Sequence, residues 1–387
     1  MEKLIVKNFG PIKKAEIELT KCVVFIGDTS TGKSVLAKLI SIFRDSFLAL
    51  STKNTDGIDF SGELKKFNID FSTSKSKITY YDDNKKLLEL RDNRIILIDS
   101  ETKKKNLEQI ENIVESVIEK FIRENPTAKS LEFDKNIFIE KGLELSLNNM
   151  QSIYIPAERI LFSLINNSLS GLWANNVALP ECYKEFASRY EVARKEINSS
   201  NYINFDLAYN FNRGNDEIIL NKTKLLLSQS SSGIQSLIPL LLVIEYETNK
   251  YEGEYKKSFI VEEPELNLFP IKQKKIINYL IDRINNESCK LIITTHSPYI
   301  LSVLDTLILA KNTFNEHPDL KEEINAIVPE SNWVDYNDIS VYEVRNDGKV
   351  YSIKNEEFKS IDTNAIDSAS DIISEEFDKL TELRYAQ

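Results

Sequence analysis

The sequence predicts an α/β protein whose strands end at a shared edge, and three observations lead to this fold class. Residues 23–26 form an apolar run that passes through a glycine-rich loop into a helix-like run at 35–40. Two later apolar runs, at 258–261 and 290–293, end in acidic or hydroxyl residues. Strands that end in polar residues beside helical segments are typical of a sheet with helices on its faces.

The loop after the first run is the most specific motif in the chain. Residues 27–34 read G-x-x-x-x-G-K-S between a strand pattern and a helix pattern, which is the context that a phosphate-binding loop (P-loop) needs. Gly27 and Gly32 let the backbone curl so that its N–H groups point at phosphate oxygens. The predicted nucleotide-binding residues are Gly27, Asp28, Thr29, Ser30, Thr31, Gly32, Lys33, Ser34 and Val35.

Two side chains of this loop have distinct expected roles. Lys33 is expected to reach the β- and γ-phosphates, and the Ser34 hydroxyl is expected to bind Mg²⁺. A glycine turn before an ordinary helix is the alternative interpretation. The flanking strand and helix favour the nucleotide site, so ATP and Mg²⁺ are the predicted cofactors.

Paired carboxylates, Glu262 and Glu263, follow the apolar run at 258–261. In P-loop enzymes the acid at such a strand end holds the metal shell, and a neighbouring Glu can polarise the attacking water. We therefore expect Glu262 to bind Mg²⁺ and Glu263 to be catalytic. Asp is the commoner residue at the first of these positions, and a solvated strand end is the alternative interpretation.

Two further segments carry candidate chemistry. His296, one of only two histidines, follows the run at 290–295 and is either structural or catalytic at the sheet edge. Residues 230–233 place three serines and Gly233 directly before an apolar helix at 234–246, whose second residue is Gln235. Serine caps helices, and a capped helix start binds anions, so this segment is either a simple cap or an anion site.

The order and residues of these segments resemble the ABC-type ATPases of the RecF/SMC/OLD branch. Residues 232–235 resemble the signature motif of this family, and residues 262–270 resemble its Walker B and D-loop string, E-E-P-E-x-x-L-x-P. Residues 295–298 resemble its switch-histidine segment, and residues 4–12 are similar to its N-terminal strand. The resemblance covers residues 1–48 and about 150–310.

This resemblance implies a compact AAA-family ATPase head at residues 1–310 with a mixed central sheet. It further implies an inserted α/β subdomain at 55–145, a helical lobe with the signature at 160–230, and a hairpin–helix extension at 311–387. Between Arg159 and Ser230 the chain has no sustained heptads, so we expect no long coiled coil. No Asp-x-Asp follows His296, so we expect no Toprim nuclease.

The resemblance also implies a head-to-head homodimer, or a higher oligomer, with ATP between the subunits. Ser232, Gly233 and Gln235 of one copy would complete the nucleotide site of the other, while Glu263 would act as base and His296 would contact the γ-phosphate. The family's Q-loop would lie near residue 154. Gln151, Glu158 and Arg159 are the candidates for its functional residue.

Two functions remain open at this stage. The first is an ATPase switch that controls a separate effector such as a nuclease or toxin, similar to compact ATPases of bacterial antiphage systems. The second is a RecF-like DNA-repair or chromosome-maintenance ATPase that binds duplex DNA directly. A transporter ATPase is disfavoured, because such proteins have a different signature. Residues 55–145 and 311–387 are the expected partner surfaces.

The composition of the chain bears on its partners and its location. A net charge of −11 weighs against a uniformly basic coat for nucleic acid, and the lysines at 103–105 and 272–275 fit ordinary solvated faces. No apolar run is long enough to cross a membrane, and the opening residues show no signal-peptide pattern. Cys22, Cys182 and Cys289 lack metal-ligand spacing. We therefore expect a cytoplasmic protein without membrane association.

Overall fold

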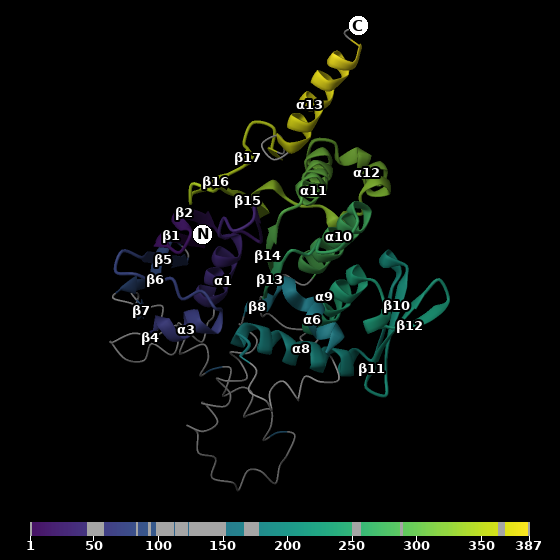
Figure 1. The fold of residues 1–387 in the computed structure, drawn as a ribbon, viewed down its shortest axis with the longest axis horizontal. Helices are drawn as coiled ribbons and strands as arrows, with labels where there is room; N and C mark the ends of the chain where they lie inside the picture. Colours follow the sequence, from purple (N-terminus) through teal and green to yellow (C-terminus); the bar gives the residue numbers. More distant parts are fainter. Residues whose placement is uncertain are drawn as a thin grey trace.

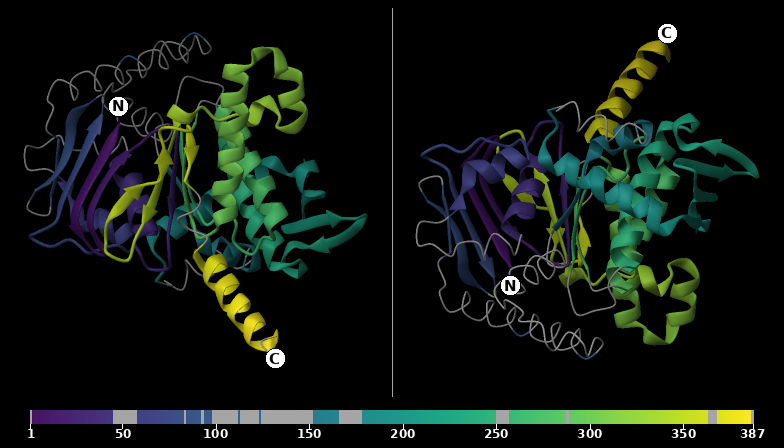
Figure 2. Two further views of the ribbon diagram at one scale, coloured as in Figure 1. Left: turned by 90° about the horizontal axis from the view of Figure 1, so that it is seen from above. Right: turned by 90° about the horizontal axis from the view of Figure 1, so that it is seen from below.

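The computed structural model describes residues 2–44, 58–82, 84–91, 94–97, 152–165, 178–249, 257–286, 289–362 and 368–385, together with positions 112 and 123. The described residues form a six-stranded central sheet with a second six-stranded sheet on one side and helices on the other (Figures 1 and 2). Within these residues no helix is both long and apolar enough to cross a membrane.

The central sheet is mixed, as predicted, with the strand order β16-β15-β3-β14-β13-β8. All neighbours pair in parallel except β15 and β16. Its strands are β3 (Cys22–Ile26), β8 (Ser152–Ile155), β13 (Ser258–Glu262), β14 (Lys290–Thr295), β15 (Ile339–Val344) and β16 (Val350–Ser352). Residues of β3 and β13 are buried at every position, because parallel strands are covered on both faces.

Two separate hydrophobic clusters cover the two faces of this sheet. On one face, Val23 and Phe25 pack with helix α1 (Lys33–Arg44) and the second sheet. On the other face, Val24 and Ile26 pack with α9 (Ser232–Asn249), α10 (Pro270–Asn286) and α11 (Pro298–Glu316). The alternation of side chains along each strand therefore places α1 and α9 on opposite sides of the sheet.

The second sheet is antiparallel and joins the N-terminal hairpin to part of the predicted insertion. It contains β1 (Lys3–Phe9), β2 (Ile12–Glu18), β4 (Ile58–Asp59), β5 (Lys77–Asp82), β6 (Lys85–Arg91) and β7 (Arg94–Leu97), with α3 (Phe60–Lys66) beside them. Because β5 pairs with β1, these strands extend the N-terminal sheet. The part of the predicted insertion at 55–145 that follows β7 lies outside the described residues except for positions 112 and 123.

The expectation of a helical lobe at 160–230 is wrong for its second half. Helices α6 (Ile160–Leu164) and α8 (Glu181–Ile197) are followed by a four-stranded antiparallel sheet of β9 (Ser199–Tyr202), β10 (Leu207–Asn212), β11 (Asn215–Leu220) and β12 (Thr223–Leu226). Leu207 and Tyr209 are buried on alternate positions of β10. Arg213 and Gly214 adopt φ of +49° and +85°, which suits the tight hairpin turn that joins β10 to β11.

The hairpin predicted within the extension at 311–387 exists as β15 and β16, but it is not an appendage. β15 pairs in parallel with β3, the strand that leads into the P-loop, so it lies inside the central sheet. Helix α12 (Lys321–Ile327) and the short strands β17 (Lys354–Asn355) and β18 (Ser360–Ile361) complete this part. The predicted terminal helix is present as α13 (Ser368–Tyr385), which projects away from the body (Figures 1 and 2).

A buried acid ties four of these elements together. Glu2, which directly precedes β1, accepts hydrogen bonds from Arg44 at the end of α1, from Lys290 on β14 and from Tyr80 on β5. Burial raises the pKa of Glu2, but the charges of Arg44 and Lys290 outweigh burial and bring it down to about 2. Ionised Glu2 therefore stabilises the fold.

Glu2→Gln should lower the free energy of unfolding by about 3 kcal/mol at pH 7, since the pKa rises from about 2 to 4.5 on unfolding. This contribution is complete above pH 4.5 and is lost as the pH falls through 2, so about half should remain at pH 3. Urea unfolding of both proteins at pH 7 and pH 3 measures it. Glu16→Gln, which breaks a more exposed ion pair with Lys3, is the control and should change stability little.

Candidate functional site

The P-loop lies between β3 and α1, and two of its glycines are required by the geometry. Gly27 and Gly32 have φ of +151° and +110°, which side chains other than hydrogen rarely allow. A Cβ on Gly27 would lie 2.2 Å from the Val344 carbonyl oxygen, and a Cβ on Gly32 would lie 2.6 Å from the Ile12 side chain. The N-terminal hairpin and β15 thus support the loop from behind, while residues 28–30 are exposed.

Lys33 begins α1 and is nearly buried, with 5% of its surface exposed. Its ammonium donates to the carbonyl oxygens of Gly27 (2.9 Å) and Asp28 (2.7 Å) and lies 3.4 Å from Nδ1 of His296. Burial lowers the pKa of Lys33, and the nearby carboxylates, Glu263 foremost, oppose this effect. The structure thus places the predicted phosphate-binding lysine beside the predicted switch histidine.

Glu262 ends β13 with its side chain buried, and its Oε1 atom has no hydrogen-bond partner among the described residues. Burial raises the pKa of this carboxyl to about 7, and the negative charge of Glu158 contributes to the rise. The positive charge of Lys38 and the hydroxyls of Tyr154 and Ser34 oppose it. An unpartnered carboxylate oxygen beside the Ser34 hydroxyl fits a cation that needs oxygen ligands, as Mg²⁺ does.

Glu263 is the first residue after β13 and adopts an uncommon backbone conformation. Its φ is +44°, and its N–H donates to the Thr294 carbonyl at 2.9 Å. This turn brings the Glu263 carboxylate within 3.4 Å of Nε2 of His296. Lys33, His296 and Glu263 therefore form a continuous row at the carboxyl edge of the central sheet.

Glu265 is a site residue for which the sequence predicted no role. Its buried carboxylate accepts hydrogen bonds from the Thr295 hydroxyl (2.6 Å) and from the His296 N–H (2.9 Å). Burial raises the pKa of Glu265. This side chain joins the turn after β13 to the end of β14, and it fixes the backbone of His296. The feature of the sequence that could have indicated a role for Glu265 is its place as the third acid of the E-E-P-E string.

The signature segment lies at the start of α9, on the other face of the sheet. Ser232 is exposed, whereas Gly233 is buried against the D-loop, where a Cβ would lie 2.6 Å from the Asn267 carbonyl oxygen. Gln235 is also buried, and its amide donates to the carbonyls of Ser228 (2.9 Å) and Ser230 (3.0 Å). Gln235 thus holds the loop before the helix rather than presenting its amide to solvent.

The three Q-loop candidates have different surroundings. Gln151 lies outside the described residues, and Glu158 is exposed. Arg159 is completely buried, and its guanidinium donates to main-chain carbonyls of Pro156, Ser236, Glu262 and Glu263. Each nitrogen of the Arg159 guanidinium therefore donates to a main-chain carbonyl inside the protein.

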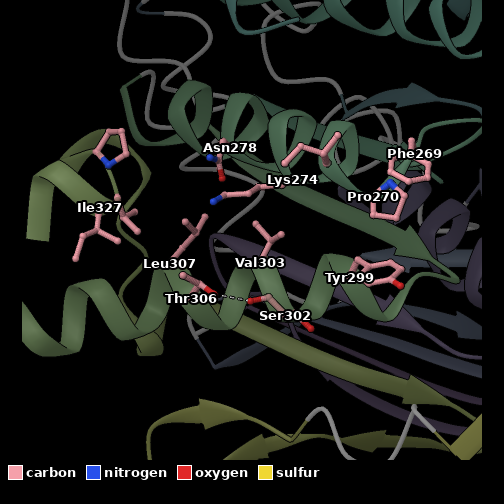
Figure 3. Close-up of a pocket in the computed structure, with 13 residues that line it drawn as sticks. Phe269, Pro270, Lys274, Asn278, Tyr299, Ser302, Val303, Thr306, Leu307 and Ile327 are labelled. Atoms are coloured by element: carbon pink, nitrogen blue, oxygen red, sulfur yellow. Dashed lines mark hydrogen bonds between the residues drawn. The ribbon is translucent and has the colours of Figure 1, made fainter. Parts of the chain in front are cut away.

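A separate hollow of about 480 Å³ lies between α10, α11 and α12 (Figure 3). Its lining is mainly apolar, with Val303 and Leu307 from α11 and Ile327 from α12, and Lys274 is its one charged side chain. It contains no residue of the P-loop. The hollow is therefore distinct from the nucleotide site, although Phe269 and Tyr299 at its end follow the D-loop and the His296 segment closely.

A family model described as "AAA ATPase domain" matches residues 1–301, and the chain belongs to this family. The protein is thus an ATPase that binds and hydrolyses ATP. No curated protein matches the chain.

The chain is also similar to several solved heads. An Smc head bound to the C-terminal winged-helix domain of ScpA is 12% identical, with a TM-score of 0.39, and the match covers 92% of this chain and 98% of that chain. An SMC head from Thermotoga maritima is 12% identical, with a TM-score of 0.35, and the match covers 78% of this chain and 90% of that chain. A Pyrococcus furiosus Smc head with an extended coiled coil, bound to the C-terminal domain of ScpA, is 11% identical, with a TM-score of 0.36. This match covers 97% of this chain and 99% of that chain.

If Glu262 holds Mg²⁺, the metal requirement should depend on pH through this carboxyl. A pKa of about 7 leaves about a tenth of the carboxyls ionised at pH 6 and about nine tenths at pH 8. The Mg²⁺ concentration for half-maximal ATP turnover should fall about tenfold over that interval. In Glu262→Gln, the Mg²⁺ requirement should change with pH only as far as the protonation of ATP itself changes its affinity for Mg²⁺. Equal pH dependence in both proteins would exclude Glu262 as the titrating group.

Proposed function

We propose that this ATPase is a switch module in which two copies close head to head around two ATP molecules and open after hydrolysis. The cycle controls a separate effector protein, a nuclease or toxin, in bacterial antiphage defence. The observation that carries the proposal is the division of the site. The row of Lys33, His296 and Glu263 lies at the P-loop edge, whereas Ser232 is exposed at the start of α9, across the central sheet.

Each half of the site is chemically incomplete without the other. Stabilising the transferred phosphoryl group requires positive charge or N–H donors on several sides. Lys33 and the P-loop amides supply one side. The exposed N-terminus of α9, with the Ser232 hydroxyl, is a suitable donor for the opposite side of a nucleotide held by a second copy. A symmetric dimer would thereby complete two sites with the same pair of surfaces.

Within one such site the described residues take separate roles. Lys33 binds the β- and γ-phosphates, and Ser34 with Glu262 holds Mg²⁺, which neutralises charge on the phosphates when bound. Glu263 orients and deprotonates the attacking water, and His296, 3.4 Å from both Lys33 and Glu263, contacts the γ-phosphate. Gln235 keeps the loop before Ser232 in place. The resemblance to ABC-type heads supports these assignments.

The alternative, a RecF-like ATPase that binds duplex DNA directly, would need a basic groove. Within the described residues, the cluster at 272–275 does not provide one. Lys272 and Lys275 both pair with Asp206, at 3.4 and 3.2 Å. Of this cluster, only Lys274 remains to contact a DNA phosphate. We therefore favour control of a protein effector. Tight DNA binding that weakens steeply with salt would favour the alternative.

Glu263→Gln should retain ATP binding and lower kcat by about 100-fold, a typical effect of losing a positioned base. Lys33→Ala is the contrasting variant. It should lose ATP binding, because the phosphates lose their charged contact. Fluorescent-nucleotide titration and steady-state phosphate release measure both properties. Wild-type turnover in Glu263→Gln would exclude Glu263 as the base.

Ser232→Glu should bind ATP but fail to form the ATP-dependent dimer, since it places a carboxylate against the partner's γ-phosphate. Ser232 is exposed, so this variant spares the fold, whereas a side chain at Gly233 would collide with Asn267. Mixing Ser232→Glu with Lys33→Ala chains should restore one composite site, with up to about half of the activity per dimer. Thr223→Glu, on exposed β12, is the control. Normal turnover by Ser232→Glu alone would rule out the trans arrangement.

A further inference from the structure

Arg159 is a buried cation whose hydrogen bonds all go to the main chain. It ends the 3₁₀ turn Ala157–Arg159 after β8, and its side chain is completely buried. No carboxylate among the described residues lies within ion-pair distance of it. Instead Nε donates to the carbonyl of Ser236 at 3.0 Å, Nη1 to Pro156 (3.0 Å) and Glu262 (2.7 Å), and Nη2 to Glu263 (2.7 Å).

Apart from Pro156, these acceptors belong to the two parts of the site that are proposed to act on the nucleotide. Glu262 and Glu263 form the turn at the end of β13, where Glu263 has a φ of +44°. A residue with a side chain adopts this conformation only when its surroundings hold it. Ser236 lies one helical turn into α9, four residues after Ser232. One planar guanidinium therefore joins the catalytic turn to the signature helix.

The geometry of the arginine fork makes this connection stiff. The donors of a guanidinium have fixed directions, so Nε cannot follow a movement of α9 while Nη1 and Nη2 stay on the catalytic turn. Burial lowers the pKa of Arg159 to about 10, and the negative charges of Glu265, Glu263 and Glu262 oppose the fall. The group therefore remains a cation at neutral pH and keeps all of its donors.

We infer that Arg159 is a positioning residue, which sets the place of the Glu263 carboxylate by holding its strained turn against the signature helix. The inference rests on the proposed function, since it requires Glu263 to act on ATP. In the proposed dimer Ser232 contacts ATP held by the partner, whereas Glu263 acts on ATP held by its own chain. Arg159 thus links the contact between Ser232 and the partner's ATP to the position of Glu263 at the ATP of its own chain.

The test uses Arg159→Lys in the full-length chain. Lysine keeps the charge but replaces the fork with a single point donor, so the turn should relax. We expect kcat to fall about 10- to 100-fold, the range for misplacing a catalytic group by about 1 Å. The ATP dissociation constant and ATP-dependent dimerisation should change less than about threefold, because Lys33 and Ser232 are untouched. A parallel loss of ATP affinity and kcat would instead show a purely structural role.

A double variant separates action through Glu263 from general damage. If Arg159 acts through Glu263, Arg159→Lys should lower kcat no more than about twofold in the Glu263→Gln background. A multiplicative loss in the double variant would overturn the inference. The proposed function fails by a different result, namely wild-type turnover in Glu263→Gln itself.

Arg194→Lys is the matched control. Arg194, on α8, is also buried, and it pairs with Asp216 at 3.4 Å and donates to the Gly214 carbonyl, both of which lie in the β10–β11 hairpin. It should lower thermal stability without changing kcat. Equal kcat losses at Arg194 and Arg159 would overturn the positioning role.

Discussion

The site depends on the parallel, in-register pairing of β3, β14 and β13. Glu262 pairs with Thr294, and Thr295 pairs with Ile26, so the carboxyl ends of three strands meet at one edge, although β3 lies more than 200 positions before the other two strands in the chain. The P-loop, His296 and Glu263 each follow one of these ends directly. A register shift of one residue in any strand would reverse the side chains that face each cluster and separate the row of Lys33, His296 and Glu263.

Burial determines the chemistry at this edge as much as proximity does. Glu262 lies where water cannot solvate it, so its carboxyl titrates near neutrality until a positive partner arrives. Arg159 lies equally deep, but four carbonyl oxygens replace the water that it has lost. Glu262 has a carboxylate oxygen without a hydrogen-bond partner, whereas every nitrogen of the Arg159 guanidinium has one. This contrast separates a group that is ready for a ligand from one that completes the protein's own framework.

Local patterns predicted the strand ends and helix starts that carry the motif residues, because the apolar flanks of these elements are unambiguous. The P-loop, the strand before Glu262 and the strand before His296 are examples. The helical lobe expected at 160–230 comes from the family resemblance, and the four short strands at 199–226, with the turn at Arg213 and Gly214, depart from it. The roles of Glu265 and Arg159 depend on contacts with residues 30 to 104 positions away. No local pattern contains such information, and the same holds for the pairing of β15 with β3.

The place of β15 in the central sheet matters to anyone who dissects this protein. The family match ends at residue 301, and the motifs that resemble the family end near residue 298, which invites truncation of the chain after this point. Such a fragment would lack β15 and leave β3 as an open sheet edge, with a row of unpaired N–H and C=O groups on the strand that carries the P-loop. Open apolar edges pair with other chains, so the fragment would self-associate through its catalytic strand. A fragment that keeps the edge of β3 paired must extend at least through Val344, the last residue of β15.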